Sequence, residues 1–212
     1  HGLISDFTAM CNLRTKAGNI IVNANLSKND TSGEYIYQAS LSSPKFSVNK
    51  LLPNNWITST GFDLIIDGEG FDLETMRAEI VSGLLFDTRI RQKNIQNIEI
   101  TGAIEEKAIE TNIIIDDSII GITLYGGINM QDEVNTYMAN ANIKHINLSE
   151  LDIWKTQLDT NITIGTTINA NIHGNNLDEL YGNVIFENTK IQINETDSFS
   201  LSNMAITARE LD

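Results

Sequence analysis

The chain has 212 residues, of which 41% are hydrophobic and 20% are charged, and these values are typical of a folded globular protein. Its 28 acidic residues outnumber its 14 Lys and Arg residues and give a formal net charge of −14. Nucleic acids and anionic membranes are bound by clustered basic side chains, and the sequence has no basic cluster, so we expect neither as a direct partner. It contains no run of 18 apolar residues that would predict a membrane-spanning helix.

Side chains with metal-binding or catalytic chemistry are sparse. Cys11 is the only cysteine, which argues against a disulfide framework or a thiolate metal site. His145 and His173 have no further ligand-type histidine or cysteine at metal-binding spacing, so surface or turn histidines are the preferred interpretation. The sequence has no nucleophile elbow, phosphate-binding glycine loop or zinc-protease motif. We therefore expect neither an enzyme nor a cofactor or metal site.

Two groups of acidic residues could suggest chemistry. The segment Asp67–Glu74 is the densest, but it lacks the spacing of an EF-hand loop, and its counterpart Asn171–Asp178 loses most of the carboxylates. A solvated turn is the preferred interpretation. Asp116 and Asp117 are adjacent on a predicted strand, so their side chains point to opposite faces and cannot flank one glycosidic bond.

The N-terminal part predicts two strands after an irregular start. Residues 3–17 are weakly patterned and predict a short helix or an irregular segment. Two stretches of hydrophobic and polar alternation then predict strands at Gly18–Leu26 and Glu34–Leu41, joined by the polar turn Lys28–Gly33. Phe46–Leu52 predicts one loose helical turn before Pro53.

From Trp56 onward the same alternation continues to the C-terminus. Side chains of a β-strand point alternately to opposite faces, so Ile, Leu and Val on one parity with Asn, Thr and Asp on the other predict half-buried strands. The predicted strands are Gly61–Gly70, Ala78–Arg91, Asn94–Glu105, Lys107–Asp116, Ser118–Asn129, Asn135–Ile143, Ile162–Ile172, Gly182–Asn194 and Phe199–Ala208. Phe71–Met76 and Lys144–Ile153 predict short helical or loop excursions, and Trp154 restarts the pattern.

A long internal repeat organises these strands. GFDLIIDGEGFDLETMRAEI (Gly61–Ile80) aligns with GTTINANIHGNNLDELYGNV (Gly165–Val184). A period of about 100 residues requires each copy to be a multi-stranded meander. We expect a piece of a longer protein, with residues 1–2 as a tag remnant, 3–53 as a partial first repeat, 54–153 as repeat 1 and 154–212 as a truncated repeat 2.

The predicted fold class is all-β, and alternation alone leaves two arrangements open. In a two-sheet β-sandwich, two apolar faces cover each other. In a curved antiparallel sheet of repeated meanders, the apolar face forms an open groove. The long repeat favours the second arrangement, because stacked meanders make one extended sheet. A carbohydrate-active β-solenoid enzyme would need convergent carboxylates and stacking aromatics, which a chain with 7% aromatic residues does not predict.

The phrase GNNLDELYGNVIFENTKI (Gly174–Ile191) resembles the TamB/AsmA-like family of the diderm bacterial envelope, and most of all its Bacteroidetes-type TamB-like members. That family repeats a strand, a Gly-x-x-Leu-x-x-Leu-x-Gly turn and a further strand. The first copy departs from the turn, because Met76 replaces the second leucine and Ala78 the second glycine. Ile114–Met130 resembles another recurrent phrase of the family.

This resemblance implies a β-taco, a U-shaped groove with a hydrophobic interior, in a periplasmic protein anchored in the inner membrane. It implies phospholipid acyl chains as cargo, in transport from the inner to the outer membrane or in outer-membrane assembly. It also implies pairing with a BamA-type outer-membrane barrel through parts outside this chain. The alternative is a non-enzymatic surface adhesion or binding β-sandwich.

The family's functional positions are groove-facing aliphatic side chains rather than catalytic residues. A single β-bulge would move a strand's side chains to the other face, so parity alone assigns them here. The predicted groove residues are Ile98, Ile100, Ile104, Ile120, Ile122, Leu124, Ile162, Ile164, Ile168, Ile172, Val184 and Phe186.

Overall fold

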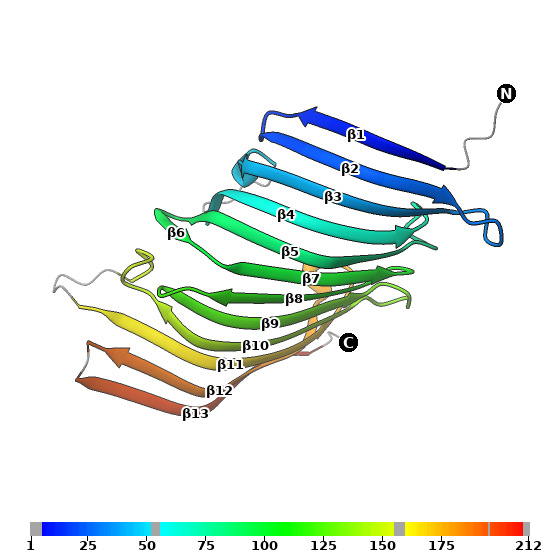
Figure 1. Cartoon of the computed structure of the whole chain (residues 1–212). Coiled ribbons are helices and arrows are strands. Elements are labelled where there is room, and N and C mark those ends of the chain that lie inside the picture. Colours follow the sequence, from blue (N-terminus) through cyan, green and yellow to red (C-terminus); the bar gives the residue numbers. More distant parts are fainter. Residues whose placement is uncertain (1–5, 52–55, 155–159, 195, 210–212) are drawn as a thin grey trace.

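Thirteen strands form one antiparallel sheet in the computed structural model of the chain (Figure 1). The structure describes residues 6–51, 56–154, 160–194 and 196–209. Each strand pairs with the next one along the chain, except that β7 follows β5 and β6 pairs with β5 alone. The elements are β1 (Asp6–Arg14), β2 (Asn19–Lys28), β3 (Tyr35–Phe46), η1 (Val48–Lys50), β4 (Ile57–Glu69), β5 (Arg77–Ile90), β6 (Lys93–Ile95), β7 (Ile98–Glu105), β8 (Ala108–Asp116), β9 (Ile120–Asn129), β10 (Thr136–Asn147), β11 (Ile162–His173), η2 (Leu177–Glu179), β12 (Tyr181–Ile193) and β13 (Asp197–Ala208).

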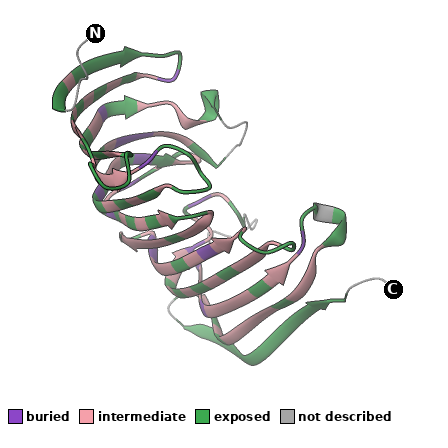
Figure 2. Ribbon diagram, turned by 90° about the vertical axis from the view of Figure 1, so that its right-hand side faces the viewer, coloured by how far each residue is buried: buried purple, intermediate pink, exposed green. Residues whose placement is uncertain are grey.

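The sheet is curved and does not close, and β1 and β13 lie at its two edges (Figures 1 and 2). Extensive contacts between strands are confined to sheet neighbours. Most of the ribbon in Figure 2 is accordingly intermediate or exposed. The prediction of a curved antiparallel sheet is confirmed. The β-sandwich alternative is wrong for the described strands, because no second sheet covers either face.

The hydrogen-bond register brings the apolar side chains of successive strands to one face. One row of this apolar face crosses the sheet through Cys11, Val22, Leu41, Leu64, Gly83, Ile100, Ile113, Leu124, Ala141, Ile168, Phe186 and Met204. The polar face lies on the opposite side, where Asn25 is paired with Gln38 and Gln38 with Asp67. A sheet with one polar and one apolar face follows from the period-two alternation in the sequence.

Matching β-bulges occur in the β4–β5 and β11–β12 pairs. In each pair the register shifts beside a residue with left-handed backbone, Asp87 (φ 48°) in β5 and Asn188 (φ 53°) in β12. Each bulge also carries two threonine hydroxyls in hydrogen-bond contact. These pairs are Thr60–Thr88 at 2.7 Å and Thr166–Thr189 at 2.8 Å. Since a bulge increases local twist, the recurrence shows the same bend built into two meanders.

The structure corrects the prediction for residues 3–17. Residues 6–14 form β1, which pairs antiparallel with β2 and places Ala9 opposite Ala24. Small side chains such as Ala9 and Cys11 weaken the apolar parity of this strand in the sequence. Pairing with a well-patterned neighbour therefore decides its conformation. The predicted tag remnant, residues 1–2, lies outside the described residues.

Other predicted boundaries shift as well. β3 extends to Phe46, beyond the predicted end at Leu41, and β4 starts at Ile57, before the predicted start at Gly61. The predicted strand Asn94–Glu105 divides into the end of β6 and the whole of β7, because Asn97 has a left-handed backbone (φ 55°). β10 continues to Asn147, beyond the predicted end at Ile143, through another register shift. The helical turn expected within Phe46–Leu52 is present as η1.

Gly182 offers a test of the β11–β12 pairing. Its φ is 137°, and an added Cβ would collide with the carbonyl oxygen of Asn171. We expect Gly182→Ala to lower the free energy of unfolding by about 1–3 kcal/mol, measured by urea denaturation. A Cβ at Gly126 meets no atom nearer than 3.6 Å, so Gly126→Ala is the matched control. Equal stability of the two variants would contradict the strained position of Gly182.

Candidate functional site

The apolar face is the candidate site, because it crosses the whole sheet and no second sheet covers it among the described strands. Strands lie about 4.8 Å apart, so the strands from β1 to β13 extend roughly 50 Å. Large apolar side chains on this face remain accessible, including Phe199 with 60% exposure and Ile206 with 58%. Contiguous exposed apolar surface of this size marks an interaction site.

One end of the apolar face is closed by connections between strands. Ile95 of β6 and Leu151 of the β10–β11 connection pack with Ile98 and Ile120 in a buried cluster. Polar contacts hold these connections in place. The backbone N–H of Gln96 donates to the Asp117 carboxylate at 3.1 Å, and Lys93 pairs with Glu150 at 3.5 Å. The apolar face at this end is therefore a small closed core.

A hollow of about 510 Å³ lies on the apolar face toward the opposite end of the strands. Its aliphatic and aromatic lining comes from β3, β4, β5, β7 and β8 and includes Tyr37, Leu41, Ile66, Ile80, Ile104 and Ile109. The β4–β5 connection folds back and adds Phe71, whose ring stacks on Tyr37 with 5.0 Å between centroids. Phe71 thus forms a partial roof over the hollow.

Contacts with the neighbouring hairpin fix this roof. Glu74 pairs with Lys107 at 2.6 Å, and the N–H of Glu106 donates to the Met76 carbonyl at 3.0 Å. Inside the connection, the Asp72 carboxylate accepts the N–H of Glu74 at 3.0 Å. The acidic segment weighed as a calcium loop is thus a tethered turn.

The described residues contain no cluster of three or more metal-ligating side chains. His145 contacts the carbonyl oxygen of Asp117 at 2.9 Å through Nε2. His173 lies 3.1 Å from the Thr136 hydroxyl and stacks on Tyr181. Both internal histidines therefore have local structural partners.

The polar face is crossed by side-chain hydrogen bonds between neighbouring strands. Asn140 donates to Asn169, which in turn donates to Glu187 at 3.2 Å. A hydrogen bond to Glu110 is the main factor that raises the pKa of Tyr125. These amide, hydroxyl and carboxylate groups keep this face compatible with water.

The structure places all twelve predicted groove residues on the apolar face. Three of them are buried, namely Ile98 (4% exposed), Ile120 (5%) and Ile162 (4%). The other nine are half-buried: Ile100, Ile104, Ile122, Leu124, Ile164, Ile168, Ile172, Val184 and Phe186. Ile98 and Ile120 belong to the closed core and do not line an open groove.

The hollow consists largely of residues that the sequence did not single out. Leu41 and Ile66 had a usable signal, because they alternate with polar residues as the predicted set does. Phe71 had none. Its position depends on how the β4–β5 connection folds back over the sheet, which the period of neighbouring strands does not encode.

No family model, curated protein or solved structure matches the chain. None of the helical turns among the described residues has the length and apolarity needed to cross a bilayer.

Truncation at the closed end should be more costly than truncation in the open region. We expect Ile98→Ala to lower the free energy of unfolding by about 2–4 kcal/mol, because it leaves a cavity in the buried cluster. Leu124→Ala, at a half-buried position, should lose only about 1–2 kcal/mol. Denaturant titration measures both. A larger loss for Leu124→Ala would show that this region is also closed.

The roof formed by Phe71 can be tested through Tyr37. Burial raises the pKa of the Tyr37 phenol above its ordinary value. We expect Phe71→Ala to expose the ring and to lower this pKa toward that of an unperturbed tyrosine, observed by NMR titration. Leu73→Ala in the same connection is the control and should leave the Tyr37 pKa unchanged. An unchanged value in Phe71→Ala would mean that Phe71 does not cover Tyr37 in solution.

Proposed function

We propose that this chain is a groove segment of a periplasmic envelope protein of the TamB/AsmA-like kind. In this proposal the apolar face shields phospholipid acyl chains from water during transport from the inner to the outer membrane or during outer-membrane assembly. One observation carries the proposal: an apolar face that crosses the whole sheet and is covered by no second sheet among the described strands.

The free energy of burial supports an apolar ligand. Removing one CH₂ group from water contributes roughly 0.8 kcal/mol, so an acyl chain laid along the face is stabilised at every carbon. The same contact covers side chains such as Phe199 and Ile206, which are otherwise exposed. A lipid chain bound to the apolar face therefore removes apolar surface of both the lipid and the protein from water.

The dimensions support a chain that lies across the strands. The apolar face is roughly 50 Å long by strand spacing. The hydrocarbon core of a bilayer is about 30 Å thick and contains two layers of acyl chains. One extended chain therefore fits lengthwise, and longer sheets built from the same meander would prolong the path.

The side-chain chemistry supports a passive role. The paired histidine and acidic groups on the polar face make local hydrogen bonds and do not converge on a cleft. In this proposal the chain has no catalytic residue and no cofactor, and it binds no nucleic acid. In the same proposal the protein pairs with a BamA-type barrel through parts outside this chain.

A charge placed on the apolar face should prevent lipid binding. Ile168→Asp puts a carboxylate at a half-buried position in the middle row of the face. A carboxylate in hydrocarbon costs about 2.5–3.5 kcal/mol, so we expect bound phospholipid to fall about 100-fold. Native mass spectrometry of the purified chain with added phosphatidylcholine measures this.

Thr167→Asp is the matched control, because the neighbouring side chain points to the polar face, and it should retain lipid. Circular dichroism checks that both variants keep their strands. Undiminished lipid on a folded Ile168→Asp variant would contradict the assignment of the apolar face as the lipid site.

A further inference from the structure

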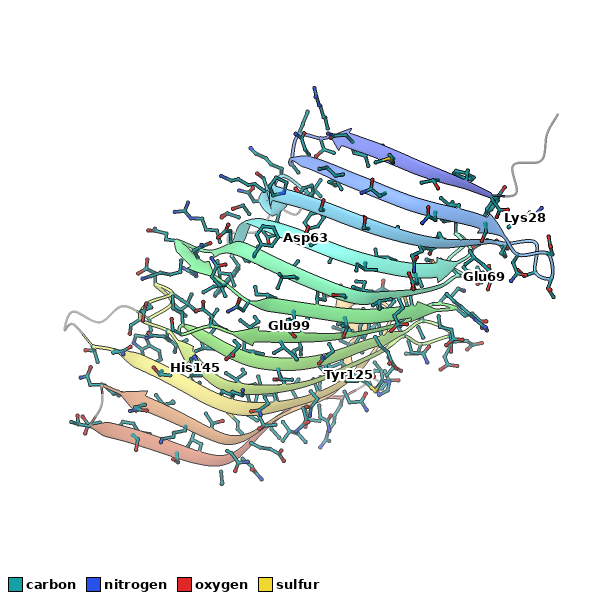
Figure 3. The ribbon with its side chains drawn as sticks, in the orientation of Figure 1. Lys28, Asp63, Glu69, Glu99, Tyr125 and His145 are labelled. Carbon is teal, nitrogen blue, oxygen red and sulfur yellow. The ribbon has the colours of Figure 1, made fainter. Side chains whose placement is uncertain are left out.

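The outer edge of β1 is open. Among the described strands, none pairs with the side of β1 that faces away from β2 (Figures 1 and 3). The nine residues of β1 pair with β2 in one unbroken register, and the strand contains neither proline nor lysine. Bulges, prolines and lysines are features that keep an edge strand from pairing with another chain. Since β1 has none of them, its edge can accept a further strand.

Every second residue of β1 turns its backbone N–H and C=O groups toward this open edge. At the β1–β2 turn, the N–H of Thr15 donates to the Gly18 carbonyl at 3.0 Å. Hydrogen-bonded pairs alternate with non-hydrogen-bonded pairs along an antiparallel ladder, so the odd-numbered residues of β1 bond to β2. A further strand can therefore bond to the even-numbered residues, which are Asp6, Thr8, Met10, Asn12 and Arg14.

The types of side chain along β1 read the same in both directions from Met10 at its centre. The matched positions are small (Ala9 and Cys11), polar (Thr8 and Asn12), large and apolar (Phe7 and Leu13), and oppositely charged (Asp6 and Arg14). A strand that pairs antiparallel with its own copy in a register centred on Met10 brings these positions opposite each other. This register therefore matches side chains along the whole strand and places opposite charges at both ends.

The side chains at the centre and the ends of β1 have few contacts within the chain. Met10 is 82% exposed and lies on the polar face, where it is paired with Asn23. In the part of the chain that the structure describes, no ion pair involves Asp6 or Arg14. A second β1 would cover Met10 with another methionine, a flexible side chain that adapts its packing, and would supply both terminal charges with partners.

We propose that β1 binds β1 of a second copy of this chain, antiparallel and centred on Met10, in a symmetric dimer. The inference goes beyond the proposed function and does not depend on lipid binding. The two-fold axis is perpendicular to the sheet at Met10, so the same edge serves both copies and their apolar faces lie on the same side. The dimer therefore has one apolar face that continues from one copy into the other.

The other edge strand, β13, lacks this symmetry. It begins with Asp197 and contains no basic residue, so a reversed copy would place Asp197 opposite the uncharged Ala208. Its pairing with β12 also passes over Asn188, which has a left-handed backbone. The self-complementary edge is therefore β1.

Exchange of the terminal charges tests the pairing. Asp6→Arg puts two cations opposite each other at both ends of the dimer, and Arg14→Asp puts two anions there. We expect each single variant to raise the dimer dissociation constant about tenfold or more, because like charges directly opposite destabilise a strand pair. The double variant Asp6→Arg/Arg14→Asp restores opposite charges and should return the constant to within about threefold of wild type. Sedimentation velocity over a concentration series of the full chain measures all four.

Lys144→Asp is the matched control for net charge. It changes the charge as Arg14→Asp does, at an exposed position of β10 that lies beside His145 in Figure 3 and far from β1. It should leave the dissociation constant unchanged. The proposal would be overturned by a wild-type chain that stays monomeric throughout the series, by single variants that dimerise like wild type, or by a double variant as weak as the single ones.

An engineered disulfide tests the register. In the proposed dimer Ala9 lies opposite the partner's Cys11 in a non-hydrogen-bonded pair, where Cα atoms are about 4.5 Å apart and a disulfide can form. We expect mild oxidation of Ala9→Cys to give a covalent dimer on a non-reducing gel, and wild type and Ala9→Cys/Cys11→Ser to give none.

Three results of this experiment would overturn the proposal. Ala9→Cys that forms no covalent dimer would show that the two positions do not meet. A covalent dimer of the wild type would place Cys11 opposite itself, in a register that leaves Asp6 and Arg14 unmatched. Equal cross-linking of Ala9→Cys/Cys11→Ser would show random collision in place of a defined strand pair.

Discussion

The structure depends on one constraint: an unbroken antiparallel register that puts the apolar side chains of every strand on the same face. With a side-chain period of two, a slip by one residue would send a strand's Ile and Leu side chains to the polar face. The register instead matches apolar rows from Cys11 in β1 to Met204 in β13. Because no second sheet covers these rows in the described structure, the same pairing that builds the fold also leaves an apolar surface accessible.

The connections between strands determine how open that surface is. At one end, Ile95 and Leu151 turn the apolar face into a closed core, which supplies stability that a single-layer sheet otherwise lacks. At the other end, Phe71 leans over a hollow without sealing it. Bulges with paired threonines bend the strands between these ends. The connections between strands therefore determine which parts of the apolar face are closed and which are open, while the strands determine how the face is oriented.

Local alternation was sufficient to predict most of the fold. The parity of Ile162–Ile172 assigned these side chains to the apolar face, where the structure has them. β11 keeps this parity because the extra residues of the bulges lie in β10 and β12. Prediction failed where partners from elsewhere decide the outcome. β1 is a strand through its pairing with β2, and Ile98 is buried by Leu151, more than 50 residues away in the sequence.

The most direct test of an acyl-chain groove is to ask which face of the sheet a lipid chain touches. NMR of isoleucine methyl groups, with a phospholipid that carries a nitroxide on its acyl chain, reports this for both faces of one sheet. The account predicts strong broadening of Ile100, Ile113 and Ile168 on the apolar face, and little change at Ile65, Ile114 and Ile185 on the polar face. Equal broadening of the two sets, or broadening confined to the polar face, would contradict it.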